Sequence, residues 1–143
     1  MKKVMLSAAA LMVFFAACNK SDDNNATRQE MLVGTWNLTE FGVDANQNGS
    51  IDAGETGAAS TLGMTMATTL NSDGTSSTVG TFAGMPSDTT AGKWSLMDSE
   101  QTLRMIEDGD TTDFIIKGLE SSKMTLLDKD GGPLAQWGVF QKQ

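Results

Sequence analysis

Alternation of apolar and polar residues dominates this chain from residue 31 onward. In residues 61–70, Leu62, Met64, Met66 and Leu70 fall on one face of an extended chain, and threonines fall on the other. This period of two predicts a strand with one buried face. The same pattern, interrupted by turn sequences rich in Asp, Gly and Asn, predicts about eight short strands at 35–43, 61–70, 75–83, 93–97, 102–107, 112–117, 122–127 and 134–141.

The order of these strands predicts an all-β fold, because no long stripe of period 3.6 interrupts them. Short hairpins would pair each strand with the one before it. About eight antiparallel strands in sequence order close most simply into an up-and-down barrel, which removes exposed sheet edges. A two-sheet β-sandwich is the alternative, and the strand count does not separate the two.

The first seventeen residues differ from this pattern and resemble an export signal. Lys2 and Lys3 precede an apolar run too short to span a bilayer, which predicts a secretory signal peptide over 1–17. The segment 15–18, Phe-Ala-Ala-Cys, resembles a bacterial lipobox, although Phe stands where Leu is usual. We therefore expect lipidation of Cys18, with an ordinary signal peptide and an incidental cysteine as the alternative.

Residues 18–30 are predicted to be a lipidated cysteine followed by a disordered tether, since this stretch has no apolar pattern to bury. Residues 20–23, Lys-Ser-Asp-Asp, resemble the export signal that places Bacteroidetes lipoproteins on the cell surface; plain linker composition is the alternative. The expected location is the outer membrane, on its periplasmic or cell-surface face. Residues 31–143 then form one domain with a modest core.

Charge and composition exclude several functions. The formal charge is −8, and removing Lys2 and Lys3 leaves 8 basic against 18 acidic residues, or −10, which disfavours nucleic acid as a partner. The chain contains no histidine and a single cysteine. Ser-His-Asp and Cys-His catalysis, His or Cys zinc sites and disulfides are therefore excluded, and we expect a protein that is not an enzyme.

The segment 44–55, DANQNGSIDAGE, matches the EF-hand calcium loop at every position of the template. Calcium takes six to eight oxygen ligands, which such a loop supplies from positions 1, 3, 5, 7, 9 and 12. Gly49 allows the reversal at position 6, and Ile51 at position 8 is expected to pack inward. An Asn-Gly-rich turn is the alternative. The predicted ligands of a structural Ca²⁺ are Asp44, Asn46, Asn48, the Ser50 carbonyl, Asp52 and Glu55.

Taken together, residues 32–38 (LVGTWNL) behind a lipobox and tether, and the later segment 92–96 (GKWSL), resemble the lipocalin-like lipoproteins of Bacteroidetes. The likeness covers most of residues 31–142. It implies a barrel whose interior could hold a small apolar ligand or a segment of a partner. The residues expected to line such a pocket are Trp36, Leu62, Met64, Met66 and Trp94.

Two functions follow from these expectations. The first is a lipid-anchored binding module of the cell envelope with a structural calcium site. The second is an accessory lipoprotein with a filled core that acts through its outer surface. The acidic hairpin that carries Glu107, Asp108, Asp110 and Asp113 is interpreted as a solvated turn, because its spacing fits no metal-site template.

Overall fold

The computed structural model describes residues 26–82, 85, 87–128, 130 and 133–143. Cys18, the leader and the first part of the tether lie outside these residues. One short α-helix, one 3₁₀ helix (η1) and nine strands make up the described chain. They are α1 (Arg28–Leu32), β1 (Gly34–Val43), β2 (Thr56–Ala58), η1 (Ala59–Leu62), β3 (Met64–Leu70), β4 (Thr75–Phe82), β5 (Asp88–Met97), β6 (Thr102–Glu107), β7 (Asp110–Leu119), β8 (Lys123–Asp128) and β9 (Gln136–Lys142).

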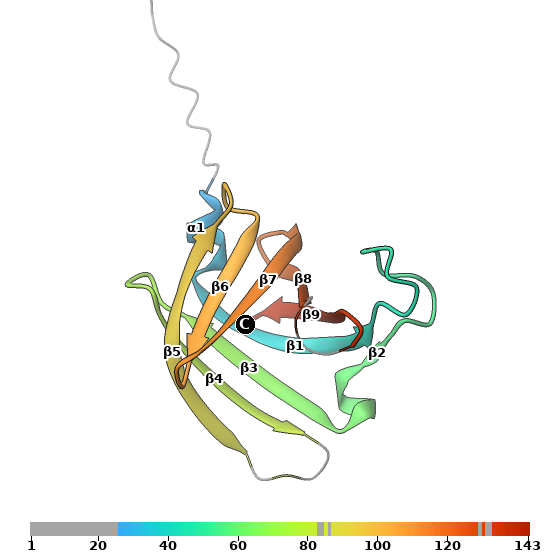
Figure 1. Cartoon of the computed structure of the whole chain (residues 1–143). Helices are drawn as coiled ribbons and strands as arrows, with labels where there is room; N and C mark the ends of the chain where they lie inside the picture. The colour runs from blue at the N-terminus through green and yellow to red at the C-terminus, as the bar shows by residue number, and fades with distance from the viewer. Residues whose placement is uncertain (1–25, 83–84, 86, 129, 131–132) are drawn as a thin grey trace, which may run out of the picture.

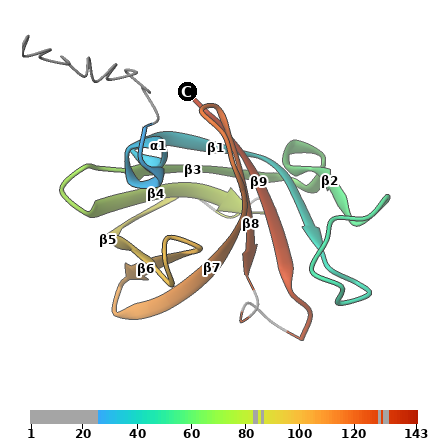
Figure 2. The ribbon, with the colours of Figure 1, turned by 90° about the horizontal axis from the view of Figure 1, so that it is seen from above.

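Eight of the strands form a closed antiparallel barrel. Each strand from β3 to β8 pairs with the next, β1 pairs with β3, and the additional pairing of β1 with β9 closes the ring (Figures 1 and 2). The short β2 extends the sheet by pairing with residues 40–42, in the second half of β1. This closure confirms the predicted up-and-down barrel and excludes the two-sheet sandwich.

Two strand boundaries differ from the prediction by more than two residues. Residues 61–63 are not extended: Thr61 and Leu62 end η1, and Gly63 closes it with a φ of +69°. Strand β5 begins at Asp88 rather than at residue 93, because Thr89 and its neighbours pair with β4. The threonine-rich start of β5 lacks apolar alternation, so only its pairing reveals it as a strand.

The long strand β1 changes its inward face part-way along. Its register with β9 shifts between Leu38 and Glu40, which marks a bulge at Thr39. Simple alternation places Phe41 on the face opposite Trp36 and Leu38. The bulge returns Phe41 to the barrel interior, where it lines the cavity described below.

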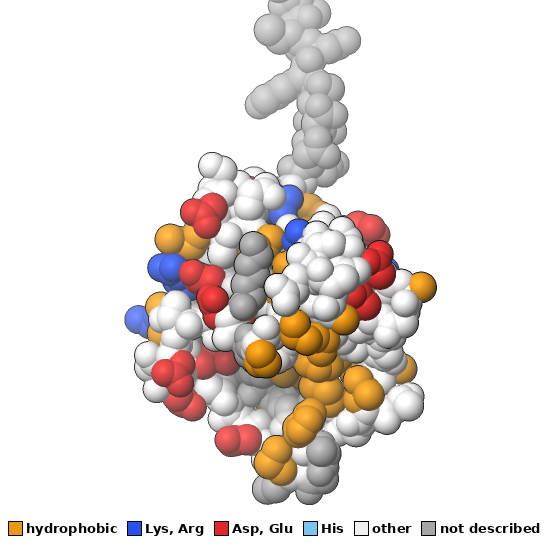
Figure 3. Space-filling view, turned by 45° about the vertical axis from the view of Figure 1, so that its right-hand side comes forward, with side chains coloured by type: hydrophobic (Ala, Val, Ile, Leu, Met, Phe, Trp, Pro, Cys, Tyr) orange, Lys and Arg blue, Asp and Glu red, His pale blue; other side chains and the backbone are white. Residues whose placement is uncertain are grey.

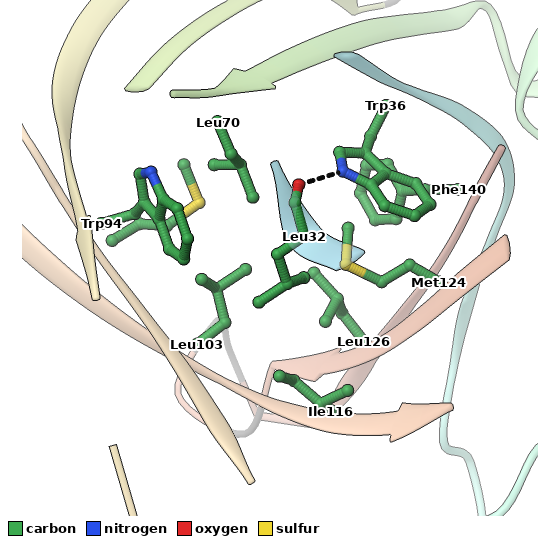
Figure 4. Packing of buried hydrophobic residues seen from close by; sticks show 10 residues of the cluster. Leu32, Trp36, Leu70, Trp94, Leu103, Ile116, Met124, Leu126 and Phe140 are labelled. Carbon is green, nitrogen blue, oxygen red and sulfur yellow. Dashed lines mark hydrogen bonds between the residues drawn. The ribbon is translucent and has the colours of Figure 1, made fainter. Parts of the chain in front are cut away.

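One end of the barrel is closed by α1 and filled with apolar side chains. Leu32 and Trp36 are completely buried, and the Trp36 Nε1 donates to the Leu32 carbonyl oxygen over 2.7 Å. Figure 4 shows Leu32 among side chains from the surrounding strands. The buried cluster comprises Leu32, Trp36, Leu70, Trp94, Leu103, Met105, Ile116, Met124, Leu126 and Phe140.

The helix corrects the predicted extent of the tether. Residues 28–30, expected to be disordered, begin α1 instead. A capping box holds the helix start: the Glu30 N–H donates to Thr27 Oγ1, and the Glu30 carboxylate accepts from the Thr27 N–H at 2.7 Å. Burial of Leu32 then gives this short helix the tertiary support that five residues alone lack. No helix in the described part of the chain is long and apolar enough to cross a membrane.

Candidate ligand cavity and calcium loop

A cavity of about 430 Å³ occupies the end of the barrel away from α1. Its rim includes Met64 at the start of β3, Asp108 in the β6–β7 turn, and Asp128 and Gln136 at the ends of β8 and β9. The volume lies within the range of small-molecule sites. The barrel is therefore filled at one end and hollow at the other.

The wall of this cavity is mostly apolar. Three phenylalanines from β1, β7 and β9 contribute to it, together with methionines and leucines that point inward from neighbouring strands. The apolar lining residues are Leu38, Phe41, Met64, Met66, Leu70, Leu103, Met105, Phe114, Met124, Leu126, Trp137 and Phe140. Six of them, Leu70, Leu103, Met105, Met124, Leu126 and Phe140, also belong to the buried cluster, which therefore extends to the cavity.

Polar side chains interrupt this wall along a track from β3 to β7. Thr68 and Thr78 share a hydrogen bond of 3.2 Å, and Thr78 Oγ1 donates to Glu107 Oε1 at 2.8 Å. Thr90 on β5 and Thr112 on β7 line the cavity on the strands that flank β6. The cavity thus combines a large apolar surface with hydroxyl groups and a carboxylate.

Glu107 has room inside the barrel because Gly92 lies beside it in the register of β5 and β6. A Cβ placed on Gly92 would lie only 2.7 Å from Glu107 Cγ and 3.1 Å from Ser76 Oγ. Ser76 is 4% exposed, and its hydroxyl has no hydrogen-bond partner among the described residues. The absence of a side chain at Gly92 therefore opens the space in which the Glu107 chain crosses the inner wall.

The predicted pocket residues divide between three places. Met64 and Met66 are among the residues that line the cavity. Trp36 and Trp94 are buried in the closed end instead, where Trp94 Nε1 donates to the Asn71 carbonyl oxygen at 2.9 Å. Leu62 lies in η1 and is 48% exposed. The prediction missed Phe114 and Met105, which strand alternation alone places on the inward faces of β7 and β6.

The acidic hairpin is divided between the two faces of the sheet. Asp113 points outward and forms a bidentate pair with Arg104, both N–O distances being 2.7 Å. The hydrogen bonds and charge of Arg104 lower the pKa of Asp113 and those of Asp113 raise the pKa of Arg104. Glu107 points inward. Interpretation of the whole group as one solvated turn therefore misses its inner member.

The loop 44–55 folds into a closed turn around the side chain of its first residue. Asp44 is only 2% exposed, and its two carboxylate oxygens accept from the N–H groups of Asn48 (3.1 Å) and Gly49 (2.8 Å). Gly49 has a φ of +69°, as the reversal at this position requires.

The remaining template positions are held together by side chains of the loop itself. The amide nitrogens of Asn46 and Asn48 each donate to Asp52 Oδ2 at 2.7 Å. Glu55 accepts from the Ala45 N–H and the Asp52 N–H. The oxygen-rich donor set is the kind that calcium prefers. Within the described residues, however, no three carboxylates, histidines or cysteines gather as a metal-binding group.

The loop is fixed to the outer wall of the barrel. Asp44 N–H donates to the Ala135 carbonyl oxygen at 2.9 Å, and a Cβ on Gly49 would lie 3.2 Å from Lys117 Nζ. The Lys117 ammonium lies 6.0 Å from the ring centroid of Trp137 on β9. Ile51, expected to pack inward, is instead 38% exposed.

Comparison with known proteins agrees with this architecture. The family model for the lipocalin-like domain matches residues 32–126. The chain belongs to the lipocalin-like family. A solved lipocalin-like protein from Bacteroides uniformis is 15% identical to this lipocalin-like chain, with a TM-score of 0.52, over 79% of this chain and 99% of that one.

A second solved structure supports the fold of this lipocalin-like protein. It is an uncharacterized protein from Bacteroides eggerthii, 14% identical, with a TM-score of 0.51, over 78% of this chain and 99% of that one. The comparison with curated proteins finds no match. At these identities the two structures establish the shared fold and do not indicate which ligand this chain binds.

Proposed function

We propose that this protein is a lipid-anchored binding module of the cell envelope that holds a small apolar ligand, or an apolar segment of a partner, without catalysis. The observation that carries this proposal is the cavity of about 430 Å³ with its apolar wall. A core that served only stability would be filled at both ends of the barrel, as it is beside α1.

Anchoring through Cys18 belongs to the same proposal. Its support is the lipobox-like sequence, since Cys18 itself lies outside the described residues. The described chain begins beside α1, at the closed end of the barrel (Figure 2). A lipid attached upstream would tether the barrel from its closed end, on the side opposite the cavity mouth.

A structural calcium ion in loop 44–55 is the third part of the proposal. The six template positions carry the oxygen donors that calcium takes, and the buried Asp44 fixes the turn from which they project. Binding would exchange the hydrogen bonds from Asn46 and Asn48 to Asp52 for ligation by oxygen. The ion would fasten the crossover between β1 and β2 to the barrel wall.

An accessory protein that acts through its outer surface is the second candidate. It is favoured by exposed apolar side chains, notably Phe82 (50% exposed) and Met85 (60% exposed) at the β4–β5 connection. Figure 3 shows apolar side chains gathered in a band down one face, with acidic side chains on its flanks. An exposed apolar surface is also expected at the entrance to an apolar cavity. The band therefore does not favour the accessory protein over the binding module.

Binding of a neutral apolar fluorophore, N-phenyl-1-naphthylamine, to the mature chain carrying Cys18→Ser tests the proposal. We expect fluorescence to rise on binding and Thr112→Phe to weaken binding severalfold, because Thr112 faces the cavity. Thr111→Phe is the matched control, since Thr111 is exposed on the outer face of the same strand. Absence of binding, or an equal effect of both variants, would contradict a ligand site inside the barrel.

A further inference from the structure

We infer that the ligand of this cavity carries a protonated amine, which Glu107 receives inside the barrel, on an apolar body that fills the remaining wall. This inference rests on the proposed binding function and specifies its ligand class. It follows from how the cavity distributes charge and hydrogen-bonding capacity.

The carboxylate of Glu107 is held by one hydrogen bond and has a second oxygen without a donor among the described residues. Thr78 Oγ1 donates to its Oε1 at 2.8 Å, and no described residue donates to its Oε2. Glu107 lines the cavity and is half-buried, so this second oxygen is available to a ligand rather than to bulk water alone. A charged donor satisfies a partly buried carboxylate more strongly than a neutral one.

The charged side chains among the described residues that line the cavity are all acidic. Glu107, Asp108, Asp110 and Asp128 line it, and none of the described lining residues is basic. Arg104 forms an ion pair with Asp113 on the outer face of the barrel. A ligand carboxylate or phosphate would therefore be repelled by Glu107 and its acidic neighbours, whereas an ammonium would be attracted, and the apolar surroundings strengthen both effects.

An ammonium has several N–H donors and needs more than one acceptor. The hydroxyls of Thr90 and Thr112 line the cavity on the strands beside β6, and neither has a hydrogen-bond partner among the described residues. Ser76, whose buried hydroxyl has no described partner, lies behind this wall next to Gly92 and is not among the residues that line the cavity. Thr90 and Thr112 extend the polar track on both sides of the carboxylate.

The rest of the wall defines the other part of the ligand. Phe41, Phe114 and Phe140 contribute aromatic rings from the strands β1, β7 and β9, whereas the Thr68–Thr78 pair lies on β3 and β4. Burial of hydrocarbon against these rings favours an alkyl or aromatic body. A molecule with both features, such as a long-chain alkylamine, uses the two kinds of wall at once.

Three probes with one chain and different head groups test this inference. Dodecylamine, dodecanol and dodecanoate are titrated calorimetrically below their aggregation concentrations into the mature chain carrying Cys18→Ser. We expect the amine to bind at least about tenfold more tightly than the alcohol, and the alcohol more tightly than the carboxylate. Glu107→Gln should remove the advantage of the amine and leave the alcohol affinity within about twofold.

Glu120→Gln is the matched control, because it removes the same charge from an exposed position and tests whether net negative charge alone attracts the amine. Glu107→Asp, which keeps the charge, should retain part of the preference and covers the case in which Glu107→Gln does not fold. Binding of dodecanol with no preference for the amine, or a preference that survives Glu107→Gln, overturns the inference alone. Failure of all three probes to bind overturns the proposed function and the inference together.

Discussion

The carbonyl oxygen of Glu55 occupies the space that a side chain on Gly42 would need. A Cβ on Gly42 would overlap this oxygen, and the Val43 N–H donates to it at 3.0 Å. The last residue of the calcium-loop template is thus packed directly on the backbone of β1. The loop and the barrel wall are in direct contact at this point, so a substitution in β1 should change the packing of the loop.

Gly42→Ala should therefore destabilise the protein by about 1–3 kcal/mol, because the added methyl group forces the loop backbone away from β1. Chemical unfolding of the mature chain measures the difference. Gly57→Ala is the matched control on β2, where an added Cβ meets nothing within 4 Å, and it should change stability by less than about 0.5 kcal/mol. Equal effects of the two substitutions would show that the close packing at Gly42 has no energetic role.

Calcium should raise the melting temperature of the mature chain by several degrees. Ligand at one hundred times its Kd adds about 2.7 kcal/mol to the free energy of unfolding, and loops of this class in extracellular modules have Kd values on the order of 10⁻⁴ to 10⁻³ M. Thermal unfolding with calcium at roughly 10–100 mM, which is one hundred times these Kd values, and with chelator measures the shift. Glu55→Gln should abolish it, and Glu120→Gln should preserve it. If calcium does not change the melt of the unsubstituted chain, loop 44–55 is a hydrogen-bonded turn without a metal.

Leu32→Ala should lower the free energy of unfolding by about 2–5 kcal/mol, since it leaves a cavity in the cluster that closes the barrel. The neighbouring substitution Met31→Ala removes a side chain that is only half-buried and should cost less than about 1 kcal/mol. Urea unfolding of both variants compares them. A small effect of Leu32→Ala would mean that the packing of α1 against the barrel does not contribute to the stability of the core.

Asp113→Asn should lower the melting temperature at pH 7, and the difference from the unsubstituted chain should shrink in acid. The pairing with Arg104 lowers the pKa of Asp113 below its ordinary value of 3.8. A carboxyl group with a lowered pKa in the folded state contributes stability above its unfolded pKa and loses that contribution as pH falls through the folded value. Melts between pH 7 and pH 2 test this.

Asp108→Asn serves as the control for this series, because Asp108 is exposed in the adjoining turn and has no pairing with Arg104. Its left-handed backbone conformation, with a φ of +52°, also suits asparagine. A difference between Asp113→Asn and the unsubstituted chain that stays constant with pH would contradict an electrostatic origin.

The strands and their order could be predicted because the signals are local. Alternation marks the buried face of β3 within seven residues, and Asp73-Gly74 or Asp108-Gly109 marks the turn that follows a strand. The start of β5 had no such signal. Its threonines carry the same side chain on both faces, so pairing with β4 alone makes this segment a strand.

The candidate site was predicted only in part because its position depends on depth within the barrel. Trp36 and Met66 both face inward, yet Trp36 lies beside α1 and Met66 lies in the cavity wall. The depth of a residue within the barrel depends on how neighbouring strands are staggered around the ring. The sequence of a single strand does not determine this stagger. The bulge at Thr39, which brings Phe41 inward, likewise exists only in the pairing of β1 with β9.

By itself the sequence determined the hairpin order, the all-β class and the template of loop 44–55, since each of these depends on residues a few positions apart. Only the tertiary structure decided that the sheet closes, that one end is filled and the other hollow, and that Glu107 and Asp113 lie on opposite sides of the wall. These features depend on contacts between segments distant in the chain, whose geometry becomes fixed when β1 meets β9.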